Sequence, residues 1–397
     1  MSDNVKNLIT FKEISLSNDL LKNKKDKANL YDLEVVMDTE TKLVHLNNNV
    51  DSKDLFNHEY VYDSSRSITM QVHFEQAAIS LQKRLNPKKV LEVGSNSGIF
   101  IKHFPSDSSI AVEPCSNFAK LTNDMGIKTY DEFWNDEVCD KILTEHGAMD
   151  LIYSANTFSH VQDLDDCLSN VDRCLSSEGT FIIETPSFLE VLKYNAFDQF
   201  YHEHHSYFTY VALQNILEKH RLKIYDIEKY KVHGGTYRFF ICKSSYQPET
   251  DTEKLVQYYN EEVEYGANSF DIIKSRIDIM QNNMIDIKET LETLKKDGKS
   301  IVGYGSTAKF TNVMNMCGLN NNHIDYVLDT TPLKHYSYIP NTNVQILPYN
   351  PNKVKDIDYF YLGAWNYRTE VINKESDYLK NGGKFITHIP KVEIISE

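Results

Sequence analysis

Residues 88–100 of the chain read KKVLEVGSNSGIF. A short run of β-prone apolar residues, 90–93, comes directly before a turn that contains Gly94 and Gly98. Glycine and other small residues after a strand let the backbone turn tightly and approach a ligand closely. The stretch therefore predicts the first strand and the ligand-binding loop of an α/β domain.

Further strand-like runs follow at the spacing that an α/β domain requires. They are SSIAVEP (108–114), AMDLIYSAN (148–156) and GTFIIETP (179–186), with stretches of helix length between them. This order predicts a parallel, doubly wound sheet. The run KIYDIEKYKVHGGTYRFFICKSS (223–245) contains two strand-like halves around a Gly-Gly pair, so we expect the sheet to end in an antiparallel hairpin.

The C-terminal third of the chain predicts a second sheet after a long helix. Between residues 252 and 298 apolar residues recur at steps of three and four, which is typical of one buried helix face. They are Phe270, Ile273, Ile277, Met280, Met284, Ile287, Leu291 and Leu294. Strand- and helix-like runs alternate again from SIVGYGS (300–306) to KFITHIP (384–390). The sequence thus predicts an α/β protein with two Rossmann-like sheets joined by a long helix.

Composition excludes several classes of protein. The 397 residues carry a formal net charge of −15, which would repel nucleic acid. No apolar run approaches the roughly 20 residues that a membrane-spanning helix needs, and the N-terminus shows no secretory signal. The six cysteines contain no CxxC pair, so we expect reduced, buried thiols. We therefore expect a cytoplasmic protein that binds neither nucleic acid nor a membrane.

An acidic residue follows the second predicted strand. Glu113 lies where a carboxylate can accept hydrogen bonds from the two ribose hydroxyls of a nucleoside. A dinucleotide would favour a GxGxxG loop, whereas residues 94–98 contain only two glycines and suit S-adenosylmethionine, which has no phosphate. The predicted cofactor-binding residues are Gly94, Ser95, Asn96, Gly98, Glu113, Pro114 and Asn156.

Titratable residues are crowded in FDQFYHEHHSYF (197–208). Such density predicts a catalytic site. A histidine can act as a base near neutral pH when a phenol or carboxylate orients it, and Tyr201, Glu203 and His204 meet that requirement. A metal site is the alternative, but His202 and His204 do not have the spacing of a helical HExxH site.

Several sequence blocks together resemble the sugar C-methyltransferases that act on nucleotide-linked 4-keto deoxysugars. The blocks are YVYDSSRS, VLEVGSNSGIF, AVEPCSNFA, DLIYSANTFSHVQDL, ETPSFLEVL, FDQFYHEHHSYFT, HGGTYRFF, VGYGSTAKFTNVMN, IDYVLDTTPLKHYSYIPNT, GAWN and GGKFITHIP. The resemblance covers residues 30 to 397. It implies a class I methyltransferase domain followed by a second Rossmann-like domain, with the nucleotide sugar between them.

The resemblance also implies a reaction and roles for individual residues. A base removes the acidic proton beside the C4 ketone, and the resulting enolate attacks the methyl group of the cofactor through C3. His204 would be the base, supported by Glu203 and Tyr201, while Tyr62 and His160 would approach the sugar. An enolate needs both a base and donors that stabilise its oxyanion, and these residue types supply both.

The predicted substrate is a nucleotide-linked sugar, dTDP-linked or similar. The residues expected to contact it are His205, Tyr207, His233, Gly234, Arg238, Gly305, Ser306, Lys309, Lys334, Trp365 and Asn366. Backbone amides, a helix start and the Lys309 cation could hold a diphosphate. The alternative is a C-terminal domain that only packs and binds nothing.

The chain departs from the family at its N-terminus. Relatives carry a zinc module with paired cysteines there, whereas residues 30–56 are free of cysteine, so we expect no structural zinc. Without such a clip, the first 55 residues would be shortened, partly disordered or held by packing. The predicted domains are an N-terminal module (1–65), a cofactor domain (66–250), a helical connector (251–298) and a nucleotide-sugar domain (299–397).

Three other functions stay open at this stage. An O- or N-methyltransferase would need a base but no enolate. A nicotinamide-binding protein would use the C-terminal glycine loop with Asp329 as its ribose acid, although the third glycine of the usual fingerprint is missing. A scaffold protein would have an inactive site, which the intact cluster from Tyr201 to His205 disfavours.

Overall fold

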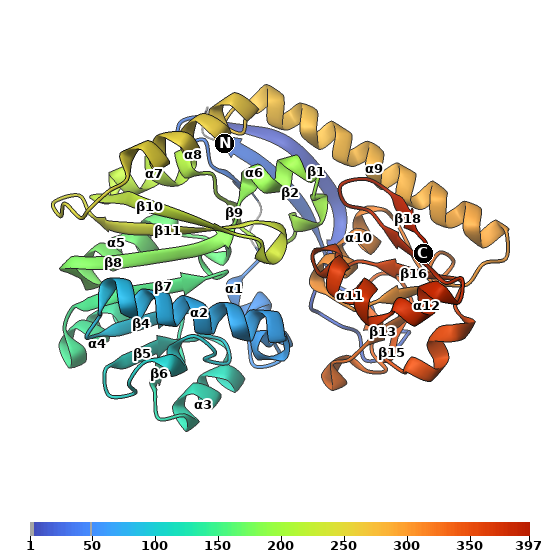
Figure 1. Ribbon diagram of the computed structural model, residues 1–397, viewed down its shortest axis with the longest axis horizontal. Coiled ribbons are helices and arrows are strands. Elements are labelled where there is room, and N and C mark those ends of the chain that lie inside the picture. The colour runs from blue at the N-terminus through green and yellow to red at the C-terminus, as the bar shows by residue number, and fades with distance from the viewer. Residues whose placement is uncertain (1–3, 48–49) are drawn as a thin grey trace.

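The computed structural model describes residues 4–47 and 50–397, and this part of the chain is arranged around three β-sheets (Figure 1). The predicted N-terminal module includes residues 1–3 and 48–49, which lie outside the described residues. Among the described residues, no helix combines the length and the apolar character that a bilayer crossing requires.

The central sheet has the strand order β10-β11-β8-β7-β4-β5-β6. Its strands are β4 (Val90–Val93), β5 (Ser109–Val112), β6 (Lys128–Tyr130), β7 (Met149–Ala155), β8 (Leu175–Pro186), β10 (Leu222–Tyr230) and β11 (Thr236–Lys243). The five strands from β8 to β6 are parallel, while β10 and β11 form an antiparallel end. The predicted doubly wound sheet and its hairpin ending are confirmed, although the sequence analysis missed β6.

Helices cover both faces of the central sheet. On one face pack α4 (Asp136–His146), α5 (Leu164–Cys174) and α7 (Tyr210–Lys219), and on the other packs α2 (Ile68–Leu85). Within β4, Leu91 joins the first of these cores and Val90 the second, as expected for a strand buried on both faces. Two shorter helices, α3 (Ser116–Asp124) and α6 (Phe188–Lys193), follow β5 and β8.

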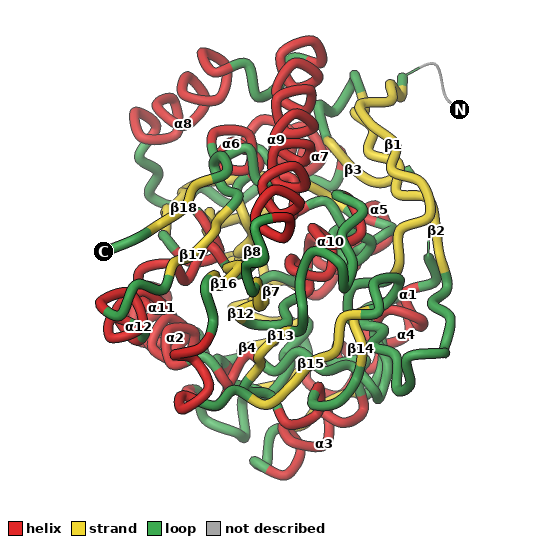
Figure 2. Tube along the Cα trace, turned by 90° about the vertical axis from the view of Figure 1, so that its right-hand side faces the viewer, coloured by secondary structure: helices red, strands yellow, loops and turns green. Residues whose placement is uncertain are grey.

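The connector consists of two helices, not one. α8 (Thr252–Tyr265) ends at Gly266, which adopts a left-handed conformation with φ 80° and caps the helix. α9 (Phe270–Lys296) then runs without interruption along the top of the molecule to the C-terminal lobe (Figures 1 and 2). All eight apolar positions predicted for one helix face are buried in, or packed against, the same core.

The C-terminal sheet has the order β14-β15-β13-β12-β16-β17-β18. Its strands are β12 (Ile301–Tyr304), β13 (Val327–Asp329), β14 (Tyr338–Ile339), β15 (Val344–Pro348), β16 (Tyr359–Leu362), β17 (Lys384–Thr387) and β18 (Glu393–Ile395). α9 and α10 (Ala308–Met316) cover one face, and α11 (Arg368–Lys374) and α12 (Ser376–Lys380) cover the other. The second Rossmann-like sheet is thus confirmed.

The N-terminal residues form a sheet of their own. β1 (Val5–Ser15), β2 (Leu30–Asp38) and β3 (Val44–Leu46) pair in order, and β3 also pairs with β9 (Ser206–Tyr207). A single helical turn, α1 (Ser52–Leu55), follows. Buried residues of the sheet belong to the same core as α9 and α10. In the described part of this segment, packing against the C-terminal domain is observed, and the strands are separated by an irregular stretch from residue 16 to 29.

One predicted substrate residue, Arg238, lies inside the fold. Its side chain is 1% exposed and pairs with Glu184, whose carboxylate is 2.8 Å from both Nε and Nη2. Tyr153 donates a hydrogen bond to the same carboxylate, and His73 contacts it as well. Burial opposes ionisation of Glu184, yet the Arg238 guanidinium and His73 lower its pKa to about 2. The geometry gives Arg238 a structural ion pair, and no contact of this side chain supports the predicted role in substrate binding.

We predict that Arg238→Met lowers the free energy of unfolding by about 3–5 kcal/mol, because it leaves a buried carboxylate without its guanidinium partner. Urea unfolding, followed by circular dichroism at neutral pH, measures the change.

Arg173→Met is a matched control. Arg173 also pairs with two carboxylates, Asp136 and Asp140, but its side chain is 40% exposed, so we expect a change of about 1 kcal/mol or less. If Arg238→Met kept wild-type stability and only weakened ligand binding, the structural role would be wrong.

Candidate active site

The loop after β4 is shaped by positive backbone angles. Gly94, Asn96 and Gly98 have φ values of 76°, 47° and 72°. A Cβ atom on Gly94 would lie 2.2 Å from Oγ1 of Thr157, so only glycine fits this position. The hydroxyls of Ser95 and Ser97 are buried and have no hydrogen-bond partner within the described residues. The loop therefore offers free donors and acceptors to a bound molecule.

Glu113, at the end of β5, closes this loop. Its Oε2 accepts a hydrogen bond from the backbone N–H of Asn96 (2.6 Å) and its Oε1 from that of Cys115 (2.9 Å). Burial raises the pKa of this carboxyl, and the two N–H groups lower it. A carboxylate has about four lone-pair positions, and besides these two N–H groups the Cys115 thiol also donates to it, so acceptor capacity stays available for a hydroxyl donor. A nucleoside with two ribose hydroxyls fits that donor requirement.

The other residues predicted for the cofactor lie at the same edge. Pro114 directly follows Glu113, and Asn156 (φ 55°) follows β7, with its N–H bonded to the Glu184 carbonyl. The side chain of Asn96 also contacts the segment before α2, because its oxygen accepts bonds from Ser64 and its nitrogen donates to the Tyr62 carbonyl, and its predicted contact with the cofactor stays a prediction. Asn96 thus fixes the segment before α2 and faces the loop through its backbone.

His204 lies in the loop before β9, and both ring nitrogens have partners. Nδ1 is 3.2 Å from the Gln199 carbonyl oxygen, which can only accept, so Nδ1 carries the hydrogen. In the neutral ring Nε2 then accepts a hydrogen bond from the Tyr201 hydroxyl, at 2.7 Å. The structure therefore brings Tyr201 and His204 together, with a lone pair on Nε2.

His160 stacks on this ring. The His160 and His204 centroids are 5.4 Å apart, and Phe56 stacks on the other face of His160 at 5.0 Å. Burial lowers the pKa of His160 to about 4. Burial also lowers the pKa of His204 well below its ordinary value, and the nearby His160 and Lys309 lower it further. Both rings are therefore neutral at pH 7, the form in which a histidine can accept a proton.

Glu203 does not contact His204 in the way that the sequence suggested. Its carboxylate accepts hydrogen bonds from Asn18 Nδ2 (2.6 Å) and from the Tyr60 hydroxyl (3.0 Å). Burial raises the pKa of Glu203 to about 7, against the lowering effect of these two donors and of Lys334. Asn18 was missed because a single asparagine in an N-terminal segment gives no signal in the sequence.

Other residues predicted for the site lie near His204 and Glu203 and differ in their solvent exposure. Tyr207, on β9, donates to the Gln199 carbonyl, and His205 stacks on His45. His233 has a left-handed conformation, and its carbonyl accepts a bond from Gln199 Nε2. Tyr62 is 45% exposed and its carbonyl accepts the bond from Asn96. Its approach to a sugar stays a prediction.

The C-terminal domain contributes two lysines from the carboxyl ends of its strands. Lys334 Nζ donates to the Ser306 carbonyl at 2.6 Å. Lys309 Nζ lies 5.6 Å from the centroid of the Trp365 ring, and within the described residues it pairs with no carboxylate. Burial lowers the pKa of both lysines. Gly305 (φ 83°) has nothing within 4 Å of a Cβ position, so the loop beside these cations is open.

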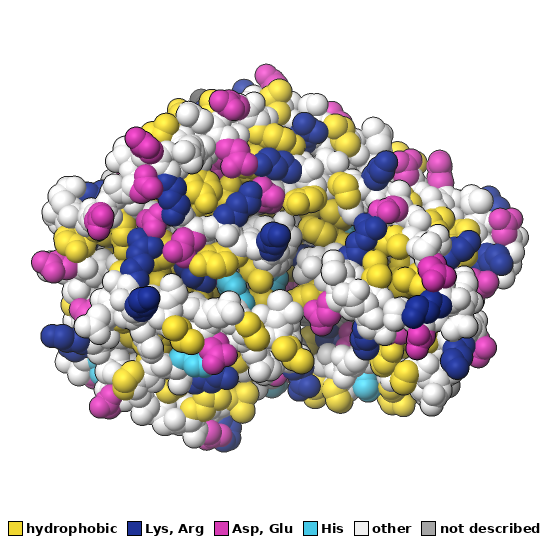
Figure 3. All heavy atoms as spheres, viewed as in Figure 1, with side chains coloured by type: hydrophobic (Ala, Val, Ile, Leu, Met, Phe, Trp, Pro, Cys, Tyr) yellow, Lys and Arg dark blue, Asp and Glu magenta, His cyan; other side chains and the backbone are white. Residues whose placement is uncertain are grey.

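Trp365 joins the two α/β domains. Its indole N–H donates to Asp198 Oδ2 at 2.8 Å, and its ring lies against Gly234, where a Cβ would be 2.4 Å from Cη2. Asn312 Nδ2 donates to the carbonyls of Asp198 and Phe200. Asn366, half-buried, follows Trp365 and has no polar contact that defines a role. Histidine side chains are visible near the centre of the face in Figure 3, where the two lobes meet.

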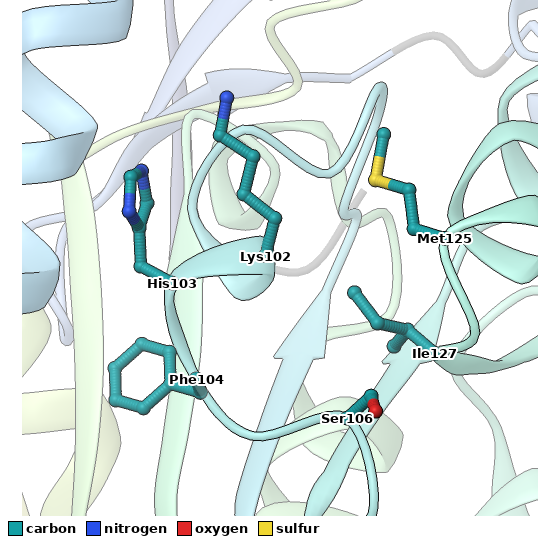
Figure 4. A pocket seen from close by; sticks show the side chains of 6 residues that line it. All are labelled: Lys102, His103, Phe104, Ser106, Met125 and Ile127. Carbon is teal, nitrogen blue, oxygen red and sulfur yellow. The ribbon is translucent and has the colours of Figure 1, made fainter.

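A separate hollow of about 410 Å³ lies away from this cluster (Figure 4). Its lining residues are Lys102, His103, Phe104, Ser106, Met125 and Ile127. Ser106 precedes β5 and Ile127 precedes β6, so the hollow is at the amino ends of the strands, opposite the glycine loop. No group of three or more histidine, cysteine or acidic residues in the described part of the chain has the arrangement of a metal site.

Comparison with known proteins agrees with this architecture. A family model described as a methyltransferase domain matches residues 72–227, and one described as a C-methyltransferase C-terminal domain matches residues 231–390. The C-methyltransferase NovU of Streptomyces niveus is 30% identical over 398 residues, which cover 98% of this chain and 94% of NovU.

Solved methyltransferase structures are also similar to part of the chain. A S-adenosylmethionine-dependent methyltransferase from Clostridium acetobutylicum is 14% identical over 44% of this chain and 92% of its own, with a TM-score of 0.34. A 1,6-didemethyltoxoflavin-N1-methyltransferase from Burkholderia thailandensis, bound to S-adenosylhomocysteine, is 17% identical over 45% of this chain and 82% of its own, with a TM-score of 0.32.

The match to NovU spans nearly the whole of both chains, and the two family models cover both α/β domains. The resemblance to C-methyltransferases drawn from the sequence blocks is thereby confirmed. The chain belongs to the C-methyltransferase family and is a S-adenosylmethionine-dependent methyltransferase.

Proposed function

We propose that the protein methylates carbon C3 of a nucleotide-linked 4-keto deoxysugar. The observation that carries this proposal is the state of His204. Its Nδ1–H is fixed on the Gln199 carbonyl, so that the lone pair of a neutral imidazole on Nε2 faces the Tyr201 hydroxyl. A base next to a movable hydrogen-bond donor is what the formation of an enolate requires.

The cofactor supplies an electrophilic methyl group on a sulfonium centre. Gly94, Ser95, Gly98 and Glu113 would hold it at the carboxyl ends of β4 and β5, with Pro114 and Asn156 alongside. The carboxylate of Glu113 would accept the ribose hydroxyls. Binding there places the methyl group beside the acceptor carbon, and such positioning supplies a large part of the rate.

The acceptor reaction would use His204 and Tyr201. Nε2 of His204 takes the proton from C3, and the electron pair of the C–H bond becomes the enolate, with negative charge on the C4 oxygen. The Tyr201 hydroxyl, released from Nε2, donates to that oxygen. The enolate carbon would then form its bond to the methyl group that the cofactor supplies, as the methyl–sulfur bond breaks and its electron pair stays on sulfur, and the C4 ketone would be restored. His160 and Tyr62 are proposed to contact the sugar.

Two half-buried cations support an anionic, nucleotide-linked substrate. Lys309 and Lys334 lie next to the open loop at Gly305 and Ser306, and within the described residues neither forms an ion pair, although the carboxylates of Asp198, Asp329 and Glu203 favour their charged forms. A buried cation is costly unless an anion neutralises it. A diphosphate at this loop would supply that charge. His205, Tyr207, His233, Gly234, Trp365 and Asn366 would form the remainder of the substrate site, between the domains.

We predict that His204→Ala reduces methyl transfer to a dTDP-linked 4-ketosugar by about 10²–10⁴-fold, because the base is lost. Mass spectrometry of the product measures methylation, and deuterium incorporation at C3 measures proton removal separately. Binding of S-adenosylmethionine, measured by calorimetry, should not change.

The control for this variant is His103→Ala, in the hollow at the opposite edge of the sheet, which should keep full activity. If wild-type protein methylated an oxygen or nitrogen without deuterium exchange at carbon, the O- or N-methyltransferase alternative would replace the proposal. Exchange at C3 that persisted in His204→Ala would assign the base to another residue.

A second prediction concerns the cofactor loop. Glu113→Ala removes an acceptor for two backbone N–H groups and for the ribose, and a hydrogen bond to a charged group contributes about 1.5–3 kcal/mol. The dissociation constant for S-adenosylmethionine should therefore rise by about ten- to a hundredfold. Calorimetric titration measures it.

Asp329→Ala provides the matched control, because Asp329 closes the second glycine loop in the same way, with bonds from the N–H groups of Ser306 and Thr331. The affinity for S-adenosylmethionine should be unchanged in this variant. Binding of NAD that Asp329→Ala abolished would instead support the nicotinamide alternative.

A further inference from the structure

The N-terminal segment at the end of β1 is attached to the C-terminal domain at both of its ends, and its middle contacts the loop that carries Glu203. We call residues 15–21 the strap. At its start, the Ser15 hydroxyl donates to Asn315 Oδ1 on α10 (3.2 Å). At its end, Leu21 and Tyr338 of β14 exchange two backbone hydrogen bonds, of 3.0 and 2.8 Å. Both ends of the strap are thus attached to the C-terminal domain.

Between these two attachments the strap reaches Glu203. Asn18 Nδ2 donates to Oε1 of Glu203 at 2.6 Å, while the Tyr60 hydroxyl donates to Oε2. Glu203 is 4% exposed. Because each carboxylate oxygen already accepts a bond, protonation of either one competes with a donor, and both donors favour the ionised form.

We propose that Asn18 is a positioning residue, which orients the carboxylate of Glu203 opposite the Tyr60 hydroxyl, in the loop that also carries His204. The strap thereby makes the N-terminal segment and the C-terminal domain part of the active site. This inference rests on the proposed function for its activity measurement, but the contact itself can be tested without substrate.

The electrostatic surroundings of Glu203 set the sign of the expected pH effects. The charged and titratable groups that face it are Tyr60, Tyr201, Cys115 and Lys334. Burial raises its pKa to about 7, and the bonds from Asn18 and Tyr60 oppose that rise. Loss of the Asn18 amide, as in Asn18→Ala, should therefore raise the pKa of Glu203 further. A carboxylate at position 18, as in Asn18→Asp, should raise that pKa most.

The first measurement is the pH dependence of kcat and KM for the methylation of a dTDP-linked 4-ketosugar. In Asn18→Ala we expect kcat to fall about tenfold, the loss expected for one hydrogen bond to a charged group. The acid limb of kcat/KM should move to higher pH, and KM for S-adenosylmethionine should stay the same. An unchanged acid limb in Asn18→Ala would overturn the proposal.

The second measurement needs no substrate. The folded state binds the Glu203 proton more tightly than the unfolded chain does, so stability falls as pH rises from about 4.5 past 7. Asn18→Asp should steepen this fall in urea unfolding between pH 6 and 9. In the double variant Asn18→Asp with Glu203→Gln, amide and carboxylate are exchanged, and the steeper fall should disappear.

Asn7→Asp is the matched control, because Asn7 Nδ2 donates to Glu34 Oε1 at 2.9 Å on the exposed face of the same N-terminal sheet. It should change the pH dependence of stability little. If Asn18→Asp and Asn7→Asp behaved alike, the Asn18 contact would be wrong.

The double variant Asn18→Asp with Glu203→Gln also distinguishes a positioning role of Asn18 from a purely structural one. We expect it to recover stability but not methylation, because the carboxylate no longer lies at residue 203. Recovery of both would overturn the proposal. If the wild-type protein methylated no ketosugar, the proposed function would fail, and the unfolding series alone would then support or overturn the Asn18 contact.

Discussion

The loop from Phe197 to Tyr207 is buried but forms little regular structure of its own. Buried backbone N–H and C=O groups need partners, so the loop must find them in other parts of the chain. Asn312 of the C-terminal domain supplies its amide to the carbonyls of Asp198 and Phe200. The N-terminal β3 pairs with the end of the loop at β9. The loop that carries His204 is thus held by two segments that are distant from it in sequence.

The glycine loops after β4 and after β12 are held by the same kind of hydrogen bonds, but they differ in the space beside them. In each, a carboxylate at the end of the second strand accepts two backbone N–H bonds, Glu113 in one domain and Asp329 in the other. Gly94 is pressed against Thr157, whereas Gly305 faces open space near Lys309. The first loop therefore suits a nucleoside that is bound through hydroxyls, and the second suits an anion.

The fold could be predicted where apolar residues recur at a regular spacing along the sequence. Most of the parallel strands and the apolar face of α9 were predicted from the sequence, because one residue pattern matches one packing surface, whereas the parallel strands β6 and β15 were missed. β1 was not predicted, since register shifts near Ile9 and between Phe11 and Ile14 interrupt its alternation. At the site, the crowded histidines of 197–208 were found from their density. The partners Asn18 and Asn312 were not, because a lone polar residue has no pattern and its contact depends on tertiary structure.

Arg238 shows the same limit for charged residues. Its sequence neighbourhood is a strand of apolar and aromatic residues, and a cation there is compatible with a substrate site or with a buried partner. Glu184 lies 54 positions earlier in the chain, on β8, and only the strand order β10-β11-β8 brings the two together. Pairing across a sheet is a property of register, which the residue types in one strand do not reveal.

The N-terminal sheet explains how a segment without paired cysteines can still place Asn18. Leu8, Val35 and Val44 share one core with Phe310 and Ile339 of the C-terminal domain. A metal clip stabilises a small module by itself, whereas apolar packing of this kind stabilises it only when it is docked on its neighbour. Docking of the N-terminal sheet also forms the β3–β9 pairing and brings the strap to Glu203. The same docked position of the N-terminal segment therefore supplies both its buried core and its contact with Glu203.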